Sequence, residues 1–309
     1  MIRLQTILLL LIVIAVVIWG VYRHTSGEDE GTPTPGQIAF EVISTPTFTP
    51  TVTPEPTNTP APTPTETPIP TATTEPTPEP TEAPVATERP VPPDLGSPDQ
   101  AVVIDRGDSG RLEIALTFDA GEGAGHTADI LDLLDAYGIK GSFGMTGQWA
   151  EANPELVRRI VDEGHMIINH TYDHKSFTGY SPGTDPLTIE QQQQQVLQTE
   201  QIILDISGYD TAPYFRFPYN DYDIDSLVAL SDIGFDIVAG YTCDTMAWWG
   251  EMAGDIVDHC SPDNPDGGPG AVILMHVVQD EDMRALPMLI DLYLSEGYDF
   301  VTYEQIIQP

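Results

Sequence analysis

Short apolar runs alternate with amphipathic stretches over residues 101–309. The apolar runs have the length of buried strands, whereas the amphipathic stretches repeat apolar residues with the period of a helix. Strands are predicted at residues 113–119, 140–146, 165–170, 214–218, 236–242 and 270–276. Helices are predicted at residues 127–138, 153–164, 188–207, 223–234 and 283–297, and residues 299–307 close the pattern. This alternation predicts an α/β fold with a parallel sheet.

Glycine follows the last periodic residue of four predicted helices, at Gly138, Gly164, Gly234 and Gly297. A glycine there lets the chain turn in the left-handed conformation and start back towards the next parallel strand. About seven strand–helix units fit into this part of the chain. That number favours a (β/α) barrel, slightly short of the usual eight units, over an open doubly wound sheet.

The first 24 residues have the pattern of a membrane segment. Residues 4–22 carry no charge after Arg3, and at about 1.5 Å per residue they match the thickness of a bilayer core. We expect a signal-anchor helix at residues 1–24 that crosses the cell membrane once and leaves the rest outside the cytoplasm. A cleaved signal peptide and a secreted protein are the alternative, but no small-x-small cleavage site follows the apolar run.

Residues 25–100 are rich in Thr and Pro, as in "TPTETPIPTATTEPTPEP". Such a segment has too few apolar residues to bury a core, and its prolines lack amide donors for regular structure. We expect a disordered, extended linker that holds a folded domain, residues 101–309, away from the membrane. A long spacer of this kind suits a target in the cell envelope.

The predicted domain is strongly acidic. Residues 101–309 hold 36 Asp and Glu residues against 8 Lys and Arg residues, a net charge near −28. This charge repels nucleic acid and anionic lipid, so a nucleic-acid partner is excluded and solubility is the simplest explanation. The only two cysteines, Cys243 and Cys260, both lie here. An exported domain allows them to form a disulfide, but sequence separation does not establish their proximity, and pairing and free thiols are both left open.

Titratable side chains stand at the ends of five predicted strands. Asp119, His170 and His276 each end a strand, Arg216 lies within one, and Asp244 follows another. In (β/α) barrels the working residues cluster at the carboxyl ends of the strands. Because each buried polar group costs stability unless it is paired, core filling does not explain five of them. We therefore expect these residues to form one site.

Two histidines in "NHTYDH", His170 and His174, are four residues apart. This spacing can place two imidazoles on one face of a helical turn, where they can hold a divalent ion. Two solvated loop histidines are the simpler reading of the pair taken alone. Asp119 at the same end of the predicted barrel favours the metal site.

Five motifs, in order, are similar to those of the polysaccharide deacetylase family, also called the chitooligosaccharide deacetylase (NodB) homology domain. They are "TFDAG", "HTYDH", "RFPYN", "DTMAW" and "ILMH". The resemblance covers residues of about 112–307. It implies a distorted (β/α)7-type barrel and a hydrolase that removes N-acetyl or O-acetyl groups from polymeric sugars with a divalent metal, often zinc, with cobalt and nickel as alternatives.

The resemblance also implies roles for the residues that match these motifs. His170 and His174 would bind the metal. Asp119 would be the general base that takes a proton from water, and Arg216 would orient it.

Four further residues receive roles on the same basis. The backbone amide near Tyr219 would stabilise the oxyanion together with the metal. His276 would be the general acid, Asp244 would set its orientation and charge, and Trp248 would shape the groove for a sugar ring.

The first motif departs from the family pattern at Ala120, where the family has a second Asp. Catalytic zinc usually has three protein ligands, so a two-histidine site should hold its metal less tightly. Water or substrate could fill the vacant position, or Glu122 or His126 could reach it. The alternative to a working enzyme is a catalytically impaired glycan-binding module. Location favours peptidoglycan as the acetylated polysaccharide, and we expect a monomeric catalytic domain.

Overall fold

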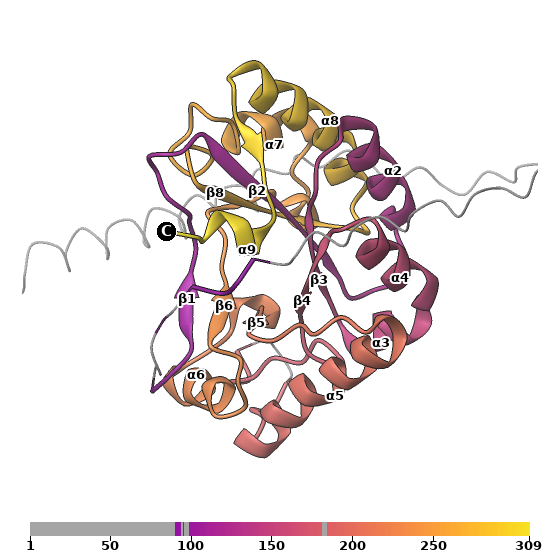
Figure 1. Cartoon of the computed structure of the whole chain (residues 1–309), viewed down its shortest axis with the longest axis vertical. Helices are drawn as coiled ribbons and strands as arrows, with labels where there is room; N and C mark the ends of the chain where they lie inside the picture. Colours follow the sequence, from indigo (N-terminus) through magenta and orange to yellow (C-terminus); the bar gives the residue numbers. More distant parts are fainter. Residues whose placement is uncertain (1–89, 94, 96–98, 181–183) are drawn as a thin grey trace, which may run out of the picture. The chain divides into compact units, whose positions relative to one another are not determined.

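The computed structural model describes residues 90–93, 95, 99–180 and 184–309 (Figure 1). The expected anchor, residues 1–24, and most of the expected linker, residues 25–100, lie outside the described residues. No helix within these described ranges is long and apolar enough to span a membrane.

A parallel sheet of nine strands forms the centre of the domain, in the order β1-β6-β5-β4-β3-β2-β8-β7, with β9 also paired to β2. The strands are β1 Val102–Ile104, β2 Glu113–Ala120, β3 Ser142–Met145, β4 Met166–Asn169, β5 Tyr214–Phe215, β6 Ile237–Ala239, β7 Cys243–Asp244, β8 Ala271–His276 and β9 Asp299–Phe300. Within the described part of the chain, no ladder joins β7 to β1 or β6. The expected barrel is therefore an incompletely closed half-barrel.

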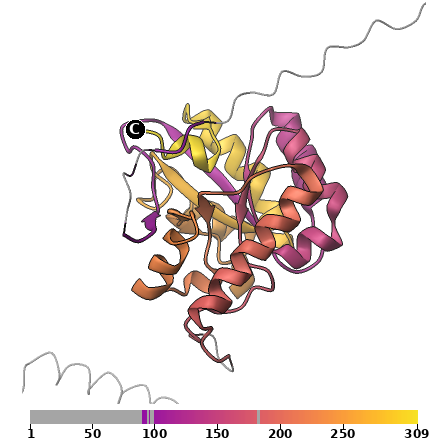
Figure 2. The ribbon, with the colours of Figure 1, turned by 60° about the horizontal axis from the view of Figure 1, so that its bottom comes forward.

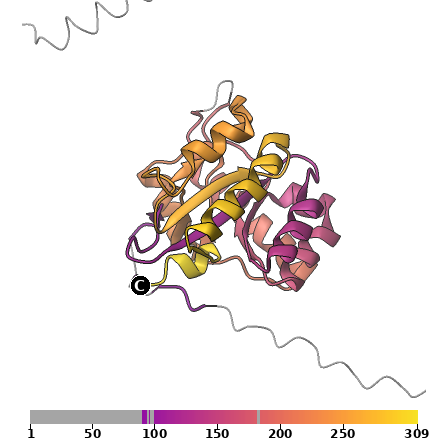
Figure 3. The same ribbon diagram turned by 90° about the horizontal axis from the view of Figure 1, so that it is seen from above.

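Helices surround this sheet (Figures 1 to 3). They are α2 Thr127–Tyr137, α3 Gly147–Ala152, α4 Pro154–Asp162, α5 Ile189–Ser207, α6 Ile224–Ser231, α7 Ala253–His259, α8 Asp280–Ser295 and α9 Tyr303–Ile306. Two 3₁₀ turns, η1 Pro218–Asn220 and η2 Ala247–Trp249, follow β5 and β7. The five helices predicted from periodicity are present within a few residues of their expected ends.

The ends of α2 illustrate how local sequence defines an element. Ile130, Leu131 and Leu134 are buried on one side of the helix and join the main apolar core. Gly138 ends the helix at φ 69°, a left-handed conformation, and its N–H binds the carbonyls of Leu134 and Asp135. Glycine adopts this conformation without the Cβ clash that other residues meet.

Strand β2 positions the site because it is an interior strand of the sheet. It pairs with β8 along one edge, and along the other edge with β9 at its start and β3 at its end. Every residue from Ile114 to Ala120 is buried. In this register Asp119 lies opposite His276 of β8 and opposite Gly144 of β3. Two of the predicted site residues are therefore neighbours across the same ladder.

Candidate active site

The carboxyl ends of parallel strands gather the predicted site residues at one edge of the sheet. Asp119 and His276 lie at the ends of β2 and β8, and Asp244 ends β7. His170 and Arg216 directly follow β4 and β5, which pair through Asn169 and Phe215. The order of the strands therefore brings Asp119 into contact with both His170 and Arg216.

A buried ion pair holds Asp119 in place. Arg216 Nη1 donates to Asp119 Oδ1 at 2.8 Å and to the Thr117 hydroxyl at 3.1 Å, and Nε donates to the Ala239 carbonyl at 2.9 Å. Asp119 and Arg216 are only 7% and 3% exposed. A Cβ on Gly144 would lie 2.3 Å from Asp119 Oδ1, so only glycine leaves room for this carboxylate.

The charge of Asp119 follows from these contacts. Burial raises the pKa of this carboxyl, but the Arg216 guanidinium and the nearby His170 and His276 outweigh burial and leave the pKa below its ordinary value. Asp119 is therefore ionised at neutral pH. Since Oδ1 is bound to Arg216, Oδ2 is the oxygen free to accept a proton.

The two predicted metal ligands lie side by side. His170 Nδ1 lies 3.0 Å from the Arg216 carbonyl, which assigns the ring proton to Nδ1 and leaves the lone pair on Nε2. The rings of His170 and His174 meet edge to face with centroids 4.8 Å apart. Burial lowers the pKa of His170, and burial lowers that of His174 to about 3. Both imidazoles are thus neutral, the form that binds a metal.

One further contact suits a bound cation. His170 Nε2 lies 3.5 Å from Asp119 Oδ2, so two electron-pair donors face each other across a short gap. A positive ion beside them would relieve their repulsion. A metal-ligating histidine commonly donates a hydrogen bond from its second ring N–H to a carbonyl, as His170 Nδ1 does to the Arg216 carbonyl. The donor set therefore fits a divalent ion.

The structure brings neither Glu122 nor His126 into a three-ligand group with His170 and His174. Ala120 is fully buried within the main apolar core. Glu122 is exposed. His126 directly precedes α2, and its Nε2 lies 2.9 Å from Oδ1 of Asp280, the first residue of α8. Among the described residues, only Cys243, His259 and Cys260 bring three potential ligand atoms within 4.8 Å of one another, and the two cysteines are joined in a disulfide. In the ranges that the structure describes, His170 and His174 therefore form no three-ligand group with a further Cys, His, Asp or Glu side chain.

Strained backbone is concentrated around these residues. In the described part of the chain, five non-glycine residues have positive φ: Thr171, His174, Tyr219, Asn220 and Met246. All five lie in loops that follow β4, β5 and β7, at the same edge of the sheet. Such conformations cost free energy and typically persist where the surrounding structure fixes a functional loop.

The loop with Tyr219 lies over the histidine pair. The Tyr219 ring is 56% exposed and packs edge to face on His174, with centroids 4.7 Å apart. Buried Asp221 fixes this loop because its carboxylate accepts hydrogen bonds from the hydroxyls of Ser176 and Thr178 and from the Thr178 amide. Asp221 therefore ties the loop of His174 to the loop of Tyr219.

The carboxylate of Asp244 contacts Trp248 rather than His276. It accepts a hydrogen bond from Met246 N at 2.9 Å and from Trp248 Nε1 at 3.1 Å. Trp248 is half-exposed, and its ring meets Trp249 edge to face. Asp244 thus positions an aromatic surface beside the site, in addition to any role towards His276.

His276 contacts a carboxylate that no motif predicted. Its backbone amide donates to Asp282 Oδ2 at 2.7 Å, and Asp282 is 2% exposed in the first turn of α8. An acidic first turn is ordinary for a helix, so nothing in the sequence pattern singles out Asp282. Its burial beside a strand-end histidine is visible only in three dimensions.

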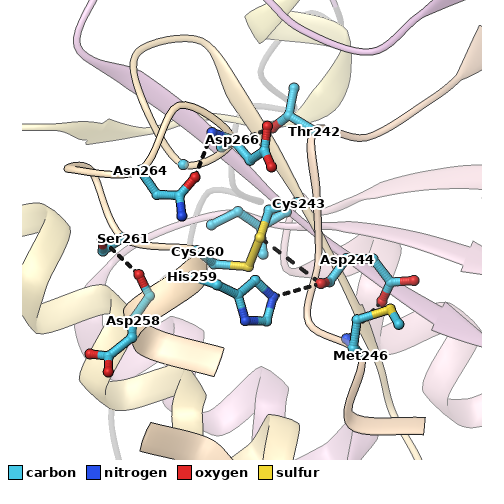
Figure 4. The surroundings of a disulfide bond; sticks show 12 residues. Thr242, Cys243, Asp244, Met246, Asp258, His259, Cys260, Ser261, Asn264 and Asp266 are labelled. Carbon is cyan, nitrogen blue, oxygen red and sulfur yellow. Dashed lines mark hydrogen bonds between the residues drawn. A yellow bond between two sulfur atoms is a disulfide. The ribbon is translucent and has the colours of Figure 1, made fainter. Parts of the chain in front are cut away.

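Cys243 and Cys260 form a disulfide, with Cα atoms 5.7 Å apart (Figure 4). This resolves the alternatives that the sequence left open. The bond joins β7 to the end of α7, and His259 adds a second link because its Nε2 lies 2.8 Å from the Asp244 carbonyl. Both links hold the segment from Asp244 to Trp248.

Comparison with known proteins places the chain in a family. Residues 106–238 match the family model for polysaccharide deacetylases. A peptidoglycan-N-acetylglucosamine deacetylase of Bacillus cereus is 33% identical over 203 residues, which cover 64% of this chain and 69% of the relative. The chain belongs to the polysaccharide deacetylase family. A second relative, the peptidoglycan-N-acetylglucosamine deacetylase PgdA of Listeria monocytogenes, is 31% identical, but the chain spans only 38% of its length.

Solved structures agree with this membership. A peptidoglycan N-acetylglucosamine deacetylase matches with a TM-score of 0.59 and 31% identity, over 67% of this chain and 92% of that one. A pseudoenzyme of the same family from Bacillus anthracis matches with a TM-score of 0.60 over 70% of each chain. At 21% identity the second likeness shows the shared fold alone.

Proposed function

We propose that this chain is a polysaccharide deacetylase that hydrolyses N-acetyl groups of a cell-envelope glycan such as peptidoglycan. One observation carries the proposal: a buried, Arg216-paired Asp119 lies beside the neutral His170 and His174 and opposite His276. A base, a pair of metal ligands and a proton donor are the groups that amide hydrolysis requires. The names of the relatives support an acetylated glycan as substrate.

The residues of the site would divide the reaction between them. Asp119 Oδ2 takes a proton from the attacking water, while Arg216 keeps the carboxylate ionised and oriented. A divalent ion held by His170 and His174, when bound, supplies positive charge that polarises the acetyl carbonyl. His276 then gives a proton to the leaving amine, so the C–N bond breaks with release of acetate.

Two aromatic residues provide surface for the sugar. Tyr219 and Trp248 are each about half-exposed beside the site. Sugar rings present C–H faces that pack on aromatic rings. The Tyr219 loop is also where we place the backbone amide that would stabilise the oxyanion.

The remaining sequence-based expectations complete the proposal. Residues 1–24 would anchor the protein in the cell membrane, and residues 25–100 would extend the domain towards the glycan. Zinc is the metal we favour, because two imidazoles suit it, with cobalt or nickel as alternatives. Secretion after signal cleavage stays the alternative to anchoring.

Ala120 favours a second candidate function. Without a third protein ligand the domain would bind an acetylated glycan through Tyr219 and Trp248 but turn it over little or not at all. The two functions are separated by measuring acetate release and glycan binding on the same preparation. Acetate release supplied with zinc, cobalt or nickel supports the enzyme, whereas binding without release supports the glycan-binding module.

A further inference from the structure

One side chain of α5 holds the centre of the loop that carries the two histidines. Gln195 Oε1 lies 2.9 Å from the Tyr172 amide nitrogen and 3.1 Å from the Asp173 amide nitrogen, so both N–H groups donate to this one oxygen. These two residues stand between His170 and His174 in the chain. Gln195 therefore fixes the middle of the histidine loop, residues 170–174, which separates the two proposed metal ligands.

The start of the histidine loop is also held by α5. Asn169 Nδ2 donates to the carbonyl of Val196, the residue after Gln195, at 3.0 Å. Asn169 Oδ1 accepts the Thr171 amide proton at 3.2 Å, and the Thr171 hydroxyl accepts the His174 amide proton at 3.1 Å. Two consecutive residues of α5 thus hold the beginning and the middle of the loop.

The opposite side of the loop is held by backbone groups. The Gly147 and Gln148 amides at the start of α3 donate to the carbonyls of Thr171 and Tyr172 at 2.9 and 3.0 Å. These bonds do not depend on a side chain. A substitution at Gln195 should therefore leave the loop attached to α3 and free two amides on its other side.

The histidine loop needs such support because its backbone is strained. Thr171 and His174 have φ angles of 65° and 60°, a left-handed conformation that costs free energy in residues with a Cβ atom. The His170 ring is held at the other end by its contact with the Arg216 carbonyl. A change of φ at His174 would therefore move one imidazole relative to the other.

We propose that Gln195 is a positioning residue for the metal site: by accepting two adjacent amide protons, it sets the separation at which His170 and His174 reach one divalent ion. The proposal rests on the deacetylase function above, which requires that ion. Gln195 acts through the backbone of Tyr172 and Asp173 rather than by binding the ion itself. Such preorganisation raises affinity because less ordering is needed when the ion binds.

Cobalt binding tests the proposal without turnover. In the full-length chain, Gln195→Leu removes the acceptor and keeps a good helix former, and it should lower cobalt affinity about tenfold, the lower end of the effect of contacts that orient metal ligands. Isothermal titration measures the affinity. The visible spectrum of bound cobalt reports its ligand geometry and should change as well. His174→Ala should abolish this spectrum, which assigns it to the histidine loop.

Two further variants separate the hydrogen bonds from packing. Gln195→Glu keeps an acceptor oxygen at the same distance from the backbone, so cobalt affinity should match or exceed that of the wild type. Gln198→Leu makes the same change at an exposed position of α5 and should leave affinity and spectrum unchanged. Thermal unfolding verifies the fold of each variant, and Gln195→Ala takes the place of Gln195→Leu if the latter does not fold.

Hydrogen exchange gives a second readout that needs no metal. The Tyr172 and Asp173 amides should exchange faster in Gln195→Leu, because they lose their acceptor, and at the wild-type rate in Gln195→Glu and Gln198→Leu. Exchange that is unchanged in Gln195→Leu contradicts the proposed support of the loop.

The cobalt results separate this inference from the proposed function. Unchanged affinity and spectrum in Gln195→Leu overturn the proposal, and so does a loss that Gln195→Glu does not restore. A wild-type chain that binds no cobalt at the histidines also overturns it. A wild-type chain that binds cobalt, loses affinity in Gln195→Leu and releases no acetate supports the role of Gln195 and contradicts the proposed function.

Discussion

At the scale of single residues, Ala120 and Asp119 show how adjacent positions can have separate effects. The ion pair with Arg216 keeps the Asp119 carboxyl ionised. The absence of a Cβ on Gly144 leaves room for this carboxylate. Ala120 contributes only apolar packing at the end of β2. In the proposed site, Ala120 stands in place of one anionic ligand, whereas the proposed base is kept. A bound metal would be more positively charged and more weakly held.

Ala120→Asp should strengthen metal binding. We expect zinc affinity to rise at least about tenfold, because a third anionic ligand joins two neutral imidazoles. Without metal the same variant should unfold at lower temperature, since Ala120 is fully buried and an unpaired carboxylate there is costly. Isothermal titration and thermal unfolding with and without zinc measure both effects. Ala120→Asp combined with His174→Ala should lose the gain, and a gain that survives would contradict a site at His174.

At the scale of elements, contacts with the end of α7 hold the segment that carries Asp244 and Trp248. Strand β7 has only two residues. The disulfide to Cys260 and the contact of His259 with the Asp244 carbonyl fix it to α7. Sequence patterns could not predict this arrangement, because β7 is too short to show a period.

Replacing both cysteines should therefore loosen this segment. Cys243→Ser with Cys260→Ser should lower the free energy of unfolding by about 3 kcal/mol, the entropy effect of closing a loop of this size. Urea unfolding of the wild type and the double variant measures the difference. Reducing agent should lower the wild type to the same value and leave the variant unchanged. An unchanged unfolding free energy in the variant would contradict a stabilising bond.

The connection between α4 and β4 contains a pH-sensitive histidine. His165 is 3% exposed, its Nδ1 accepts the Gly141 amide proton at 3.0 Å, and burial lowers its pKa from 6.5 to about 4. Between these values the unfolded chain binds more protons than the folded one. The stability that His165 contributes is therefore complete above pH 6.5 and falls as the pH drops towards 4.

His165→Asn should remove this dependence, because the amide oxygen can still accept from Gly141 but does not titrate. We expect the wild type to lose about 3 kcal/mol relative to the variant between pH 7 and pH 4. Urea unfolding over this pH range measures the free energy of unfolding of both proteins. Carboxylates common to both titrate alike, so their effect cancels when one free energy is subtracted from the other. A constant difference would show that His165 protonates freely in the folded state.

At the scale of the whole molecule, periodicity predicted the helices and strands better than it predicted whether the sheet closes into a barrel. The five long helices, the strands that end in Asp119 and His276, and the strand that precedes His170 are where the pattern places them. The pattern missed α7, β1 and the opening between β7 and β1, since strand pairing depends on distant segments. Site residues at strand ends were predictable because parallel strands end at one edge.

Other parts of the site could not be read from the chain. Asp282 stands in an acidic helical turn like many surface helices, and only its burial distinguishes it. The disulfide required the distance between Cys243 and Cys260. The positive φ of Thr171 is likewise set by the folded loop and not by the preference of a β-branched residue.

Acetate release from peptidoglycan tests the central claim most directly. The full-length chain, supplied in turn with zinc, cobalt and nickel, should release acetate, and Asp119→Asn should lower kcat at least about 100-fold because the general base is lost. The variant keeps the size of the side chain and its acceptor for Arg216. Release by the wild type that does not exceed release by Asp119→Asn with any of the three metals would contradict the account.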